Sequence, residues 1–387
     1  MNRLFSPSVL NVLDEILQNC ERKIIVTLDK FDEGYEAFRV DAKGTPNEGD
    51  VIDFEAIWCR SLVNTVYNIK HQQTDQIENI FVPLSKLITF CICLPYDRYL
   101  GFIQDSRDAY RFNNDTIPLT WTGVELSILL RKRIENIFML EEDINASWKS
   151  IDPKMSPEDV LKYCIDLKYP KLPSHITLSI KSGTAEMPLF QYMLSRSFWR
   201  PRDIMEQFAS IITSVSLVKK ADSIQSLIKR NCAAISEKII RNEFWGEFGK
   251  IYTNLEAITY SFFGANQLMS YNELFEILSS DSIKLTRYDG ALIDNADKIF
   301  EILYELGFLG IRATENFQDA CHAGHKDIIC FCEGFQPLNG IKTDEFKECN
   351  FFINPIFTEV LQFKINCPDL ICNYPWDYLY HGEGIFD

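Results

Sequence analysis

The sequence predicts an α/β fold followed by an α-helical part and a winged-helix part. Two continuously apolar runs, residues 24–28 and 87–94, are typical of buried strands in a parallel sheet. Helical patterns alternate with these strands, as they do in parallel α/β sheets. After residue 266, short helices lead into a small hairpin pattern, which favours a winged helix.

The composition supports two or three folded domains. The chain has 387 residues, of which 46% are hydrophobic, so a sizeable core is expected. We divide it into an α/β core over residues 1–140, a helical part over 141–265, a winged-helix domain over 266–365 and a tail over 366–387.

The net charge bears on which partners the chain can bind, and the cysteine content bears on the compartment in which it works. The net charge of -16 argues against non-specific binding to nucleic acid or anionic lipid. The 12 cysteines accompany an N-terminus that lacks the pattern of a signal peptide, and the run "LITFCICL" is too short to span a bilayer. We therefore expect a cytoplasmic chain with reduced thiols and a protein partner, with no membrane or nucleic-acid partner. Oligomerisation stays open.

Local signals place several helices. A helix over 117–138 is predicted with Thr122 as its N-cap and Glu125 closing a capping box. The chain from there to residue 265 is interpreted as mostly helical, and Pro201 suits the first turn of the clearest of these helices. Farther on, "NADKIFEILYEL" predicts a helix that ends at Gly307 and turns into a strand.

The carboxylates after the first strand are the candidate catalytic residues. At the end of a sheet strand, Asp29 would hold Mg²⁺ through water, and Asp32 or Glu33 would activate the attacking water. Acidic residues are also ordinary turn residues, and the sequence alone leaves the two readings balanced. No G-x-x-x-x-G-K-[ST] loop occurs anywhere in the chain.

Five motifs in order resemble a bacterial P-loop ATPase family related to the KAP and STAND groups of NTPases. They are "TLDKFDEGY", "FCICLPYDRYLGF", "PLTWTGVELSILLRKRI", "WRPRDIMEQF" and "ILYELGFLGI", spread over most of residues 23–361. The resemblance implies a partial NTPase core with a Walker B-like strand, a helical lid that opens at "RPRD" and a C-terminal winged helix. Asp29, Arg200 and Arg202 would then contact Mg²⁺ and the phosphates of ATP.

The chain also departs from the pattern of that family. Only 23 residues precede Ile24, so we expect the upstream phosphate-binding loop to be missing. Pro95 stands where the family has an arginine after the second strand, and Lys30 stands where many related ATPases have an acid. Each departure removes part of the machinery of hydrolysis.

Arg202 and a cysteine–histidine group carry further alternatives. A cation in the first turn of a helix opposes the macrodipole, so Arg202 is expected to meet an anion. That anion is a phosphate or, as we prefer, an acid such as Asp203 or one from a neighbouring domain. The cysteines and histidines between residues 321 and 349 include zinc-type ligands but no C-x-x-C pair, and we interpret them as buried reduced cysteines rather than a zinc site.

The leading interpretation is a degenerate, non-hydrolysing ATPase-like protein that acts through protein contacts, in bacterial anti-phage defence or regulation. The isolated chain would need no cofactor. The alternative is a genuine ATPase, split over two chains or seen as a fragment, that uses ATP and Mg²⁺ once a Walker A half is supplied. A winged-helix DNA regulator comes third, because the helix near residues 294–305 is acidic.

Overall fold

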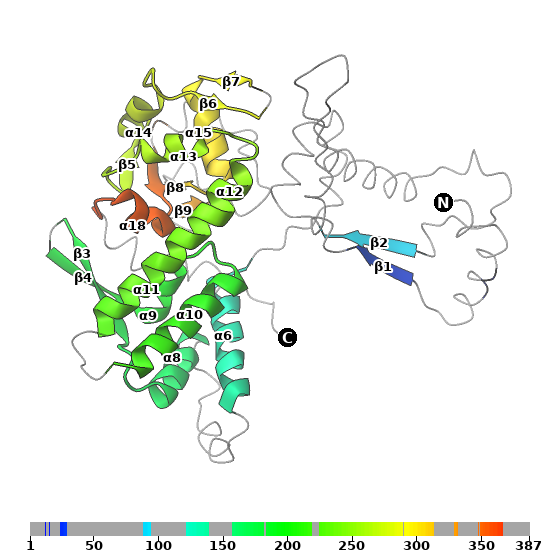
Figure 1. Cartoon of the computed structure of the whole chain (residues 1–387), viewed down its shortest axis with the longest axis vertical. Coiled ribbons are helices and arrows are strands. Elements are labelled where there is room, and N and C mark those ends of the chain that lie inside the picture. Colours follow the sequence, from blue (N-terminus) through cyan, green and yellow to red (C-terminus); the bar gives the residue numbers. More distant parts are fainter. Residues whose placement is uncertain are drawn as a thin grey trace. The chain divides into compact units, whose positions relative to one another are not determined.

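The computed structural model describes most of the chain after residue 121 and two strands before it. The described residues are 12, 15, 24–28, 88–93, 121–138, 157–181, 183–218, 224–288, 290–312, 329–331, 347 and 349–366. Contacts divide the chain into two compact units, Met1–Ile117 and Pro118–Asp387, and each is described by itself. Together they form a mixed α and β fold (Figure 1).

The first unit contains the two strands that the sequence predicts. Strand β1 is Ile24–Leu28 and strand β2 is Ile88–Ile92. They pair in parallel, in a register that runs from Ile24 opposite Ile88 to Leu28 opposite Ile92. The predicted parallel pairing is confirmed.

The predicted burial of these strands on both faces is wrong. None of their described side chains is buried, and Ile25 is 70% exposed. The physical reason is that β-branched residues also suit strands whose surface is only partly buried. The apolar run therefore predicts the strand but not a cover over its faces.

The second unit begins with a group of helices around one hydrophobic core. They are α6 (Gly123–Phe138), α8 (Pro157–Lys168), α9 (Leu189–Leu194), α10 (Pro201–Ser216) and α11 (Ile224–Ile239). The predicted capping box of α6 is confirmed, because the Glu125 amide donates to Thr122 Oγ1 at 3.1 Å and the Thr122 amide donates to Glu125 Oε2 at 2.9 Å.

Helix α6 lies on the other side of the domain boundary from where the sequence places it. Its residues Leu126, Leu130 and Ile134 are fully buried in a core shared with α8 and α10. The boundary expected at residue 140 therefore differs from the observed one at residue 117. The apolar face of a helix predicts that the helix packs, but it does not identify the neighbour.

The part interpreted as mostly helical also contains a β-hairpin. Strands β3 (His175–Ile180) and β4 (Gly183–Pro188) pair antiparallel along their full length and stand out at the side of the unit (Figure 1). Gly183 has a φ of 139°, a conformation that residues with a side chain rarely adopt. A short turn around this glycine reverses the direction of the chain. The prediction of helical structure is therefore wrong for the residues of β3 and β4.

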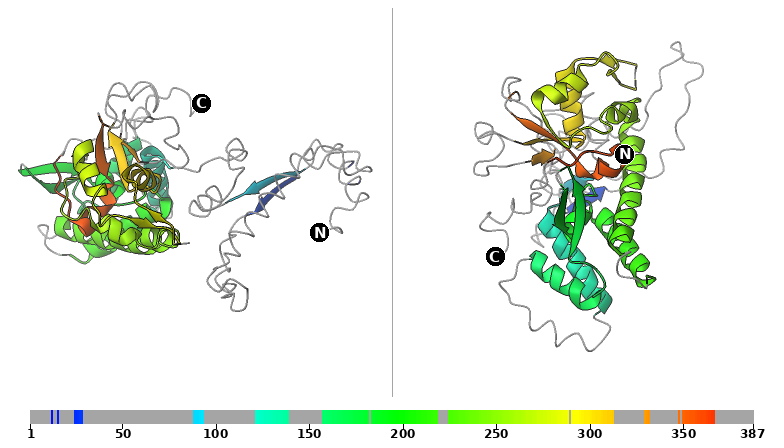
Figure 2. Two further views of the ribbon diagram at one scale, coloured as in Figure 1. Left: turned by 90° about the horizontal axis from the view of Figure 1, so that it is seen from above. Right: turned by 90° about the vertical axis from the view of Figure 1, so that its left-hand side faces the viewer.

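A long helical run passes from the helix group to the C-terminal part of the unit (Figure 2). It continues from α11 through the π-helical turn η5 (Ile240–Phe244) into α12 (Trp245–Phe248). Phe244 and Phe357 meet edge to face, with ring centroids 4.9 Å apart, and Phe308 contacts Phe357 in the same way. These rings join the π-helical turn to the C-terminal core.

The C-terminal part consists of short helices around a four-stranded antiparallel sheet. Its elements are α13 (Leu255–Tyr260), β5 (Leu268–Ser270), α14 (Tyr271–Leu278), β6 (Leu285–Thr286), β7 (Leu292–Ile293), α15 (Ala296–Glu305), β8 (Leu309–Arg312), β9 (Ile329–Phe331), β10 (Asn350–Ile353), η6 (Pro355–Phe357) and α18 (Thr358–Leu361). The sheet order is β5-β10-β8-β9. The helix that turns into a strand at Gly307 is confirmed, and this glycine has a φ of 76°.

Candidate functional site

The carboxylates predicted to be catalytic lie outside the described residues. Asp29 follows directly after the last residue of β1, and Asp32 and Glu33 come shortly after it. The structure therefore contains the strand, β1, that precedes these carboxylates. Their own roles stay predictions.

Arg200 and Arg202, the predicted phosphate contacts, are described. They belong to the RPRD turn, residues 200–203, where the chain enters α10. Pro201 occupies the start of the helix, as predicted, because its missing N–H needs no partner there. Trp199, just before the turn, has a φ of 58°, which is uncommon for a residue other than glycine.

Both arginines of the RPRD turn form ion pairs with Glu243, which lies in the π-helical turn η5. The Glu243 side chain is 13% exposed, whereas those of Arg200 and Arg202 are 41% and 71% exposed. The anion that the sequence predicted for Arg202 is thus an acid from another helix, and Asp203 is not its ion-pair partner. A phosphate at this turn would compete with Glu243.

Asp203 is the buried acid of the turn, with 1% of its surface exposed. Its Oδ2 accepts a hydrogen bond from the Phe198 amide at 3.3 Å. The pKa of Asp203 is raised to about 6. Burial is the largest cause and Glu243 adds to it, while Arg200, the Phe198 hydrogen bond and Arg202 act in the opposite direction. The charge of the turn therefore changes near neutral pH.

The π-helical turn and the backbone of Trp199 suggest that this region serves more than packing. Single π-helical turns inside α-helices are frequent at functional sites, and non-glycine residues at positive φ cluster at ligand sites and switch regions. Here the two features meet, because Glu243 from η5 holds the arginines next to Trp199. We take the RPRD turn with Glu243 as the candidate functional site.

A buried arginine near this turn was missed by the sequence analysis. Arg196 is 2% exposed, and its Nη2 donates to Glu359 Oε1 at 3.2 Å while Nη1 donates to the Pro355 carbonyl at 3.2 Å. Its own carbonyl oxygen accepts hydrogen bonds from Gln207 at 2.7 Å and Ser236 at 2.8 Å. Arg196 thus connects α10 and α11 to the C-terminal part, and no sequence spacing indicated it.

The described residues offer no reactive thiol in the core. Burial raises the pKa of Cys164 and of Cys232 to about 12, so both stay protonated and unreactive. Cys349 is buried, as the sequence predicts, whereas most of the cysteines and histidines between residues 321 and 332 lie outside the described residues. Within the described part of the chain, no cluster of three or more histidine, cysteine or acidic residues has the geometry of a metal site.

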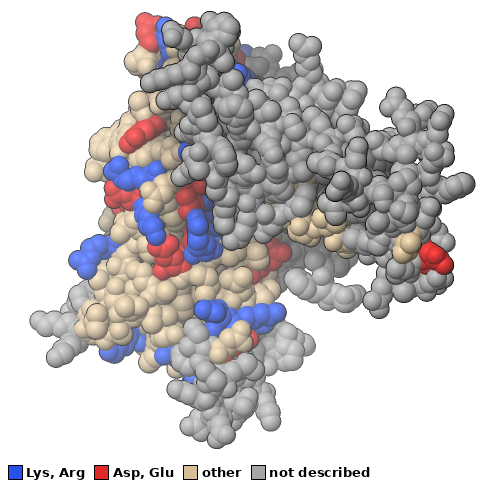
Figure 3. Space-filling model, turned by 45° about the vertical axis from the view of Figure 1, so that its right-hand side comes forward, with Lys and Arg blue, Asp and Glu red and all other residues tan. Residues whose placement is uncertain are grey.

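The surface of the described unit mixes both signs of charge. On the face shown in Figure 3, lysines and arginines lie between aspartates and glutamates instead of gathering in one basic patch. Among the described helices, none is long and apolar enough to span a membrane.

The described residues thus define a mixed α/β protein with a partly exposed arginine–carboxylate cluster in its larger unit. The chain is similar to the putative transposon gamma-delta 80.3 kDa protein of Escherichia coli (strain K12), with 22% identity over 325 residues. The match covers 81% of this chain and 38% of that protein, so the chain spans a little over a third of the length of this relative. No family model matches the chain, and no solved structure matches it.

Proposed function

We propose that this chain is a degenerate, non-hydrolysing ATPase-like protein that works through protein contacts. The observation that carries the proposal is the pairing of both RPRD arginines with Glu243. Arginines that neutralise a transferring phosphate act by facing it directly. Here a carboxylate of the same chain takes the place of the phosphate. The parallel pairing of β1 and β2 suits the NTPase-like core that the resemblance implies.

The C-terminal part supports the contact role, and we interpret it as a winged helix. Two helices, α14 and α15, lie between β5 and β8, and β10 returns between these two strands in the sheet. In this interpretation α15 is the helix that would enter a DNA groove. Its one lysine, Lys298, pairs with Glu301 at 2.8 Å, and Asp297 lies in its first turn. We therefore propose a protein-contact module.

We expect no steady release of phosphate from ATP and Mg²⁺ by the purified chain. The backbone N–H groups and the lysine of a phosphate-binding loop provide most of the grip on a triphosphate, and the sequence lacks that motif. A coupled phosphate assay measures this directly. Turnover that disappears in Asp29→Ala would reject the proposal and favour the genuine ATPase.

The genuine ATPase is the second candidate, with its Walker A half on another chain. Asp29 and Asp32 would then serve Mg²⁺, and Arg202 would exchange Glu243 for a phosphate. The high exposure of Arg202, 71%, favours this candidate, because the side chain is accessible to a ligand. A neighbouring gene that encodes G-x-x-x-x-G-K-[ST] would support it, and turnover on mixing the two chains would establish it.

We expect the full chain to bind duplex DNA no more tightly than about millimolar at physiological salt. DNA affinity comes from lysines and arginines that release counterions from phosphates, and α15 offers more acids than bases. Fluorescence anisotropy with a labelled duplex at two salt concentrations measures it. A winged-helix DNA regulator is the third candidate. Micromolar binding that weakens steeply with salt would promote it.

A further inference from the structure

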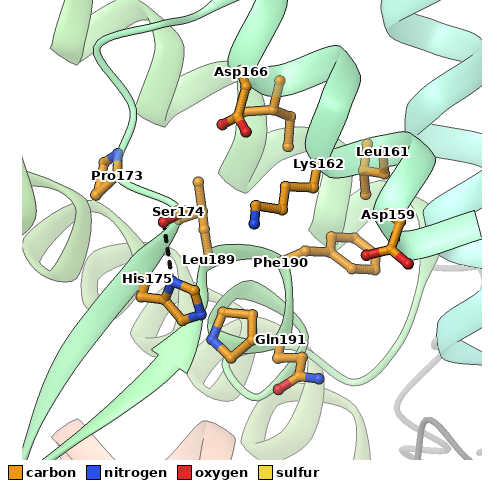
Figure 4. Close-up of a pocket in the computed structure, with 12 residues that line it drawn as sticks. Asp159, Leu161, Lys162, Asp166, Pro173, Ser174, His175, Leu189, Phe190 and Gln191 are labelled. Atoms are coloured by element: carbon orange, nitrogen blue, oxygen red, sulfur yellow. Dashed lines mark hydrogen bonds between the residues drawn. The ribbon is translucent and has the colours of Figure 1, made fainter.

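A cavity of about 300 Å³ lies between α8, the start of β3 and the start of α9 (Figure 4). Buried apolar side chains form part of its wall, namely Leu161, Ile165, Leu189 and Phe190. A pocket of this size lies at the lower end of the range for small-molecule sites, which is about 300–1,000 Å³. It suits a ligand with a short apolar body.

A lysine and a histidine reach the cavity from opposite walls. Lys162 extends from α8 over Leu189 and Phe190, and His175 lies across from it at the start of β3 (Figure 4). Ser174 Oγ and His175 Nδ1 are 3.0 Å apart, so this hydrogen bond orients the ring and leaves the second ring nitrogen for another partner. Lys162 takes part in none of the ion pairs found among the described residues.

Two carboxylates stand on the same wall as Lys162. Asp159 and Asp166 lie three residues before and four residues after it on α8, and both line the cavity. These spacings place the three charges on one face of the helix. All three side chains are exposed, and they border a wall that includes the buried Leu189 and Phe190.

We propose that this cavity binds a small zwitterion with an apolar side chain, the chemistry of a free apolar α-amino acid. The ligand carboxylate would meet Lys162 and His175, its ammonium group would meet Asp159 or Asp166, and its side chain would cover the apolar wall. A purely anionic ligand is disfavoured because the Asp166 carboxylate stands beside Lys162 on the same wall. A purely cationic ligand leaves Lys162 without a counter-charge.

The test is an isothermal titration of the full chain with L-leucine and L-phenylalanine. We expect at least one of them to bind with a Kd on the order of 1 mM or tighter, as suits so small a ligand. N-acetyl-leucine lacks the ammonium group and leucinamide lacks the carboxylate, so each should bind at least tenfold more weakly than leucine. Equal binding of all three probes, stronger binding of inorganic phosphate, or no binding of either amino acid would overturn the proposal.

Two variants of α8, one single and one double, test the positive and the negative charges of the cavity separately. Lys162→Gln should weaken the better amino acid at least tenfold and leave leucinamide unchanged, whereas Asp159→Asn combined with Asp166→Asn should weaken leucinamide as well. Lys250→Gln, at an exposed turn outside the cavity, is the matched control and should change nothing. Thermal melts confirm that each variant is folded. Unchanged leucine binding in folded Lys162→Gln would also reject the site.

Discussion

Glu359→Gln is expected to destabilise the chain more than Arg196→Met, although Arg196 is the buried member of the pair. The Glu359 side chain is 45% exposed and that of Arg196 is 2% exposed. Removing the glutamate charge leaves a guanidinium buried without a counter-charge. Removing the arginine leaves a carboxylate that water can still reach. An unpaired buried charge is the more costly of the two.

The magnitudes follow from what each variant leaves behind. Glu359→Gln should cost about 2–4 kcal/mol, somewhat below the range for a fully buried pair because solvent reaches Glu359. Arg196→Met keeps a long apolar side chain and removes one donor from the Pro355 carbonyl, which still accepts from Thr358 Oγ1 at 2.6 Å, so the loss should cost about 0.5–1.5 kcal/mol. The double variant should resemble Arg196→Met alone, because no unpaired charge remains in it.

Chemical denaturation of the four proteins measures this cycle. The matched control is Glu237→Gln, which breaks the exposed pair with Arg241 and should cost less than about 1 kcal/mol. If Glu359→Gln proves as mild as this control, Arg196 does not depend on its counter-charge. The connection between the helix group and the C-terminal part would then rest on packing and on hydrogen bonds such as that from Arg196 to the Pro355 carbonyl.

Features with a local cause were predictable from the sequence. The capping box at Thr122 and Glu125 depends on two residues three positions apart, and the structure forms both of its hydrogen bonds. Pro201 begins α10 for an equally local reason. The parallel pairing of β1 and β2 was predicted from the continuous apolar character of the two runs.

The features that were missed depend on residues far apart in the chain or on backbone conformation. Glu243 is 43 positions from Arg200 and 41 from Arg202, so no spacing rule brings these side chains together. Arg196 and Glu359 are 163 positions apart. The sequence analysis missed the hairpin of β3 and β4. Its turn depends on the positive φ of Gly183, and the sequence does not state the backbone conformation of a glycine.

The sequence therefore predicted the arginine of the candidate site and its need for an anion, but not the residue that supplies that anion. The sequence indicated that a cation in the first turn of α10 needs an anion, which is a local electrostatic argument. It did not identify Glu243, because the glutamate reaches the turn only through the π-helical segment η5. An inserted residue in a helix changes which side chains share a face, and the sequence carries no strong signal of it.

The last prediction concerns Asp203, whose raised pKa makes stability depend on pH. The pKa of Asp203 is about 6 in the folded chain, compared with about 4 for an unfolded aspartate. Between these values the folded chain holds a proton that the unfolded chain has lost. Stability from this group is therefore full below about pH 4 and falls as the pH rises to about 6, by up to about 3 kcal/mol.

Asp203→Asn removes this titration and keeps an oxygen that accepts from the Phe198 amide. The difference in unfolding free energy, wild type minus Asp203→Asn, should therefore fall between pH 4 and pH 7. Denaturation series at matched pH values measure it, and Asp281→Asn, at an exposed turn, gives the reference curve for losing an exposed carboxylate. A rising difference would mean that Arg200 and Arg202 stabilise the ionised form more than burial opposes it. The RPRD turn together with Glu243 would then be neutral at all physiological pH values, instead of gaining a positive charge as Asp203 takes up its proton.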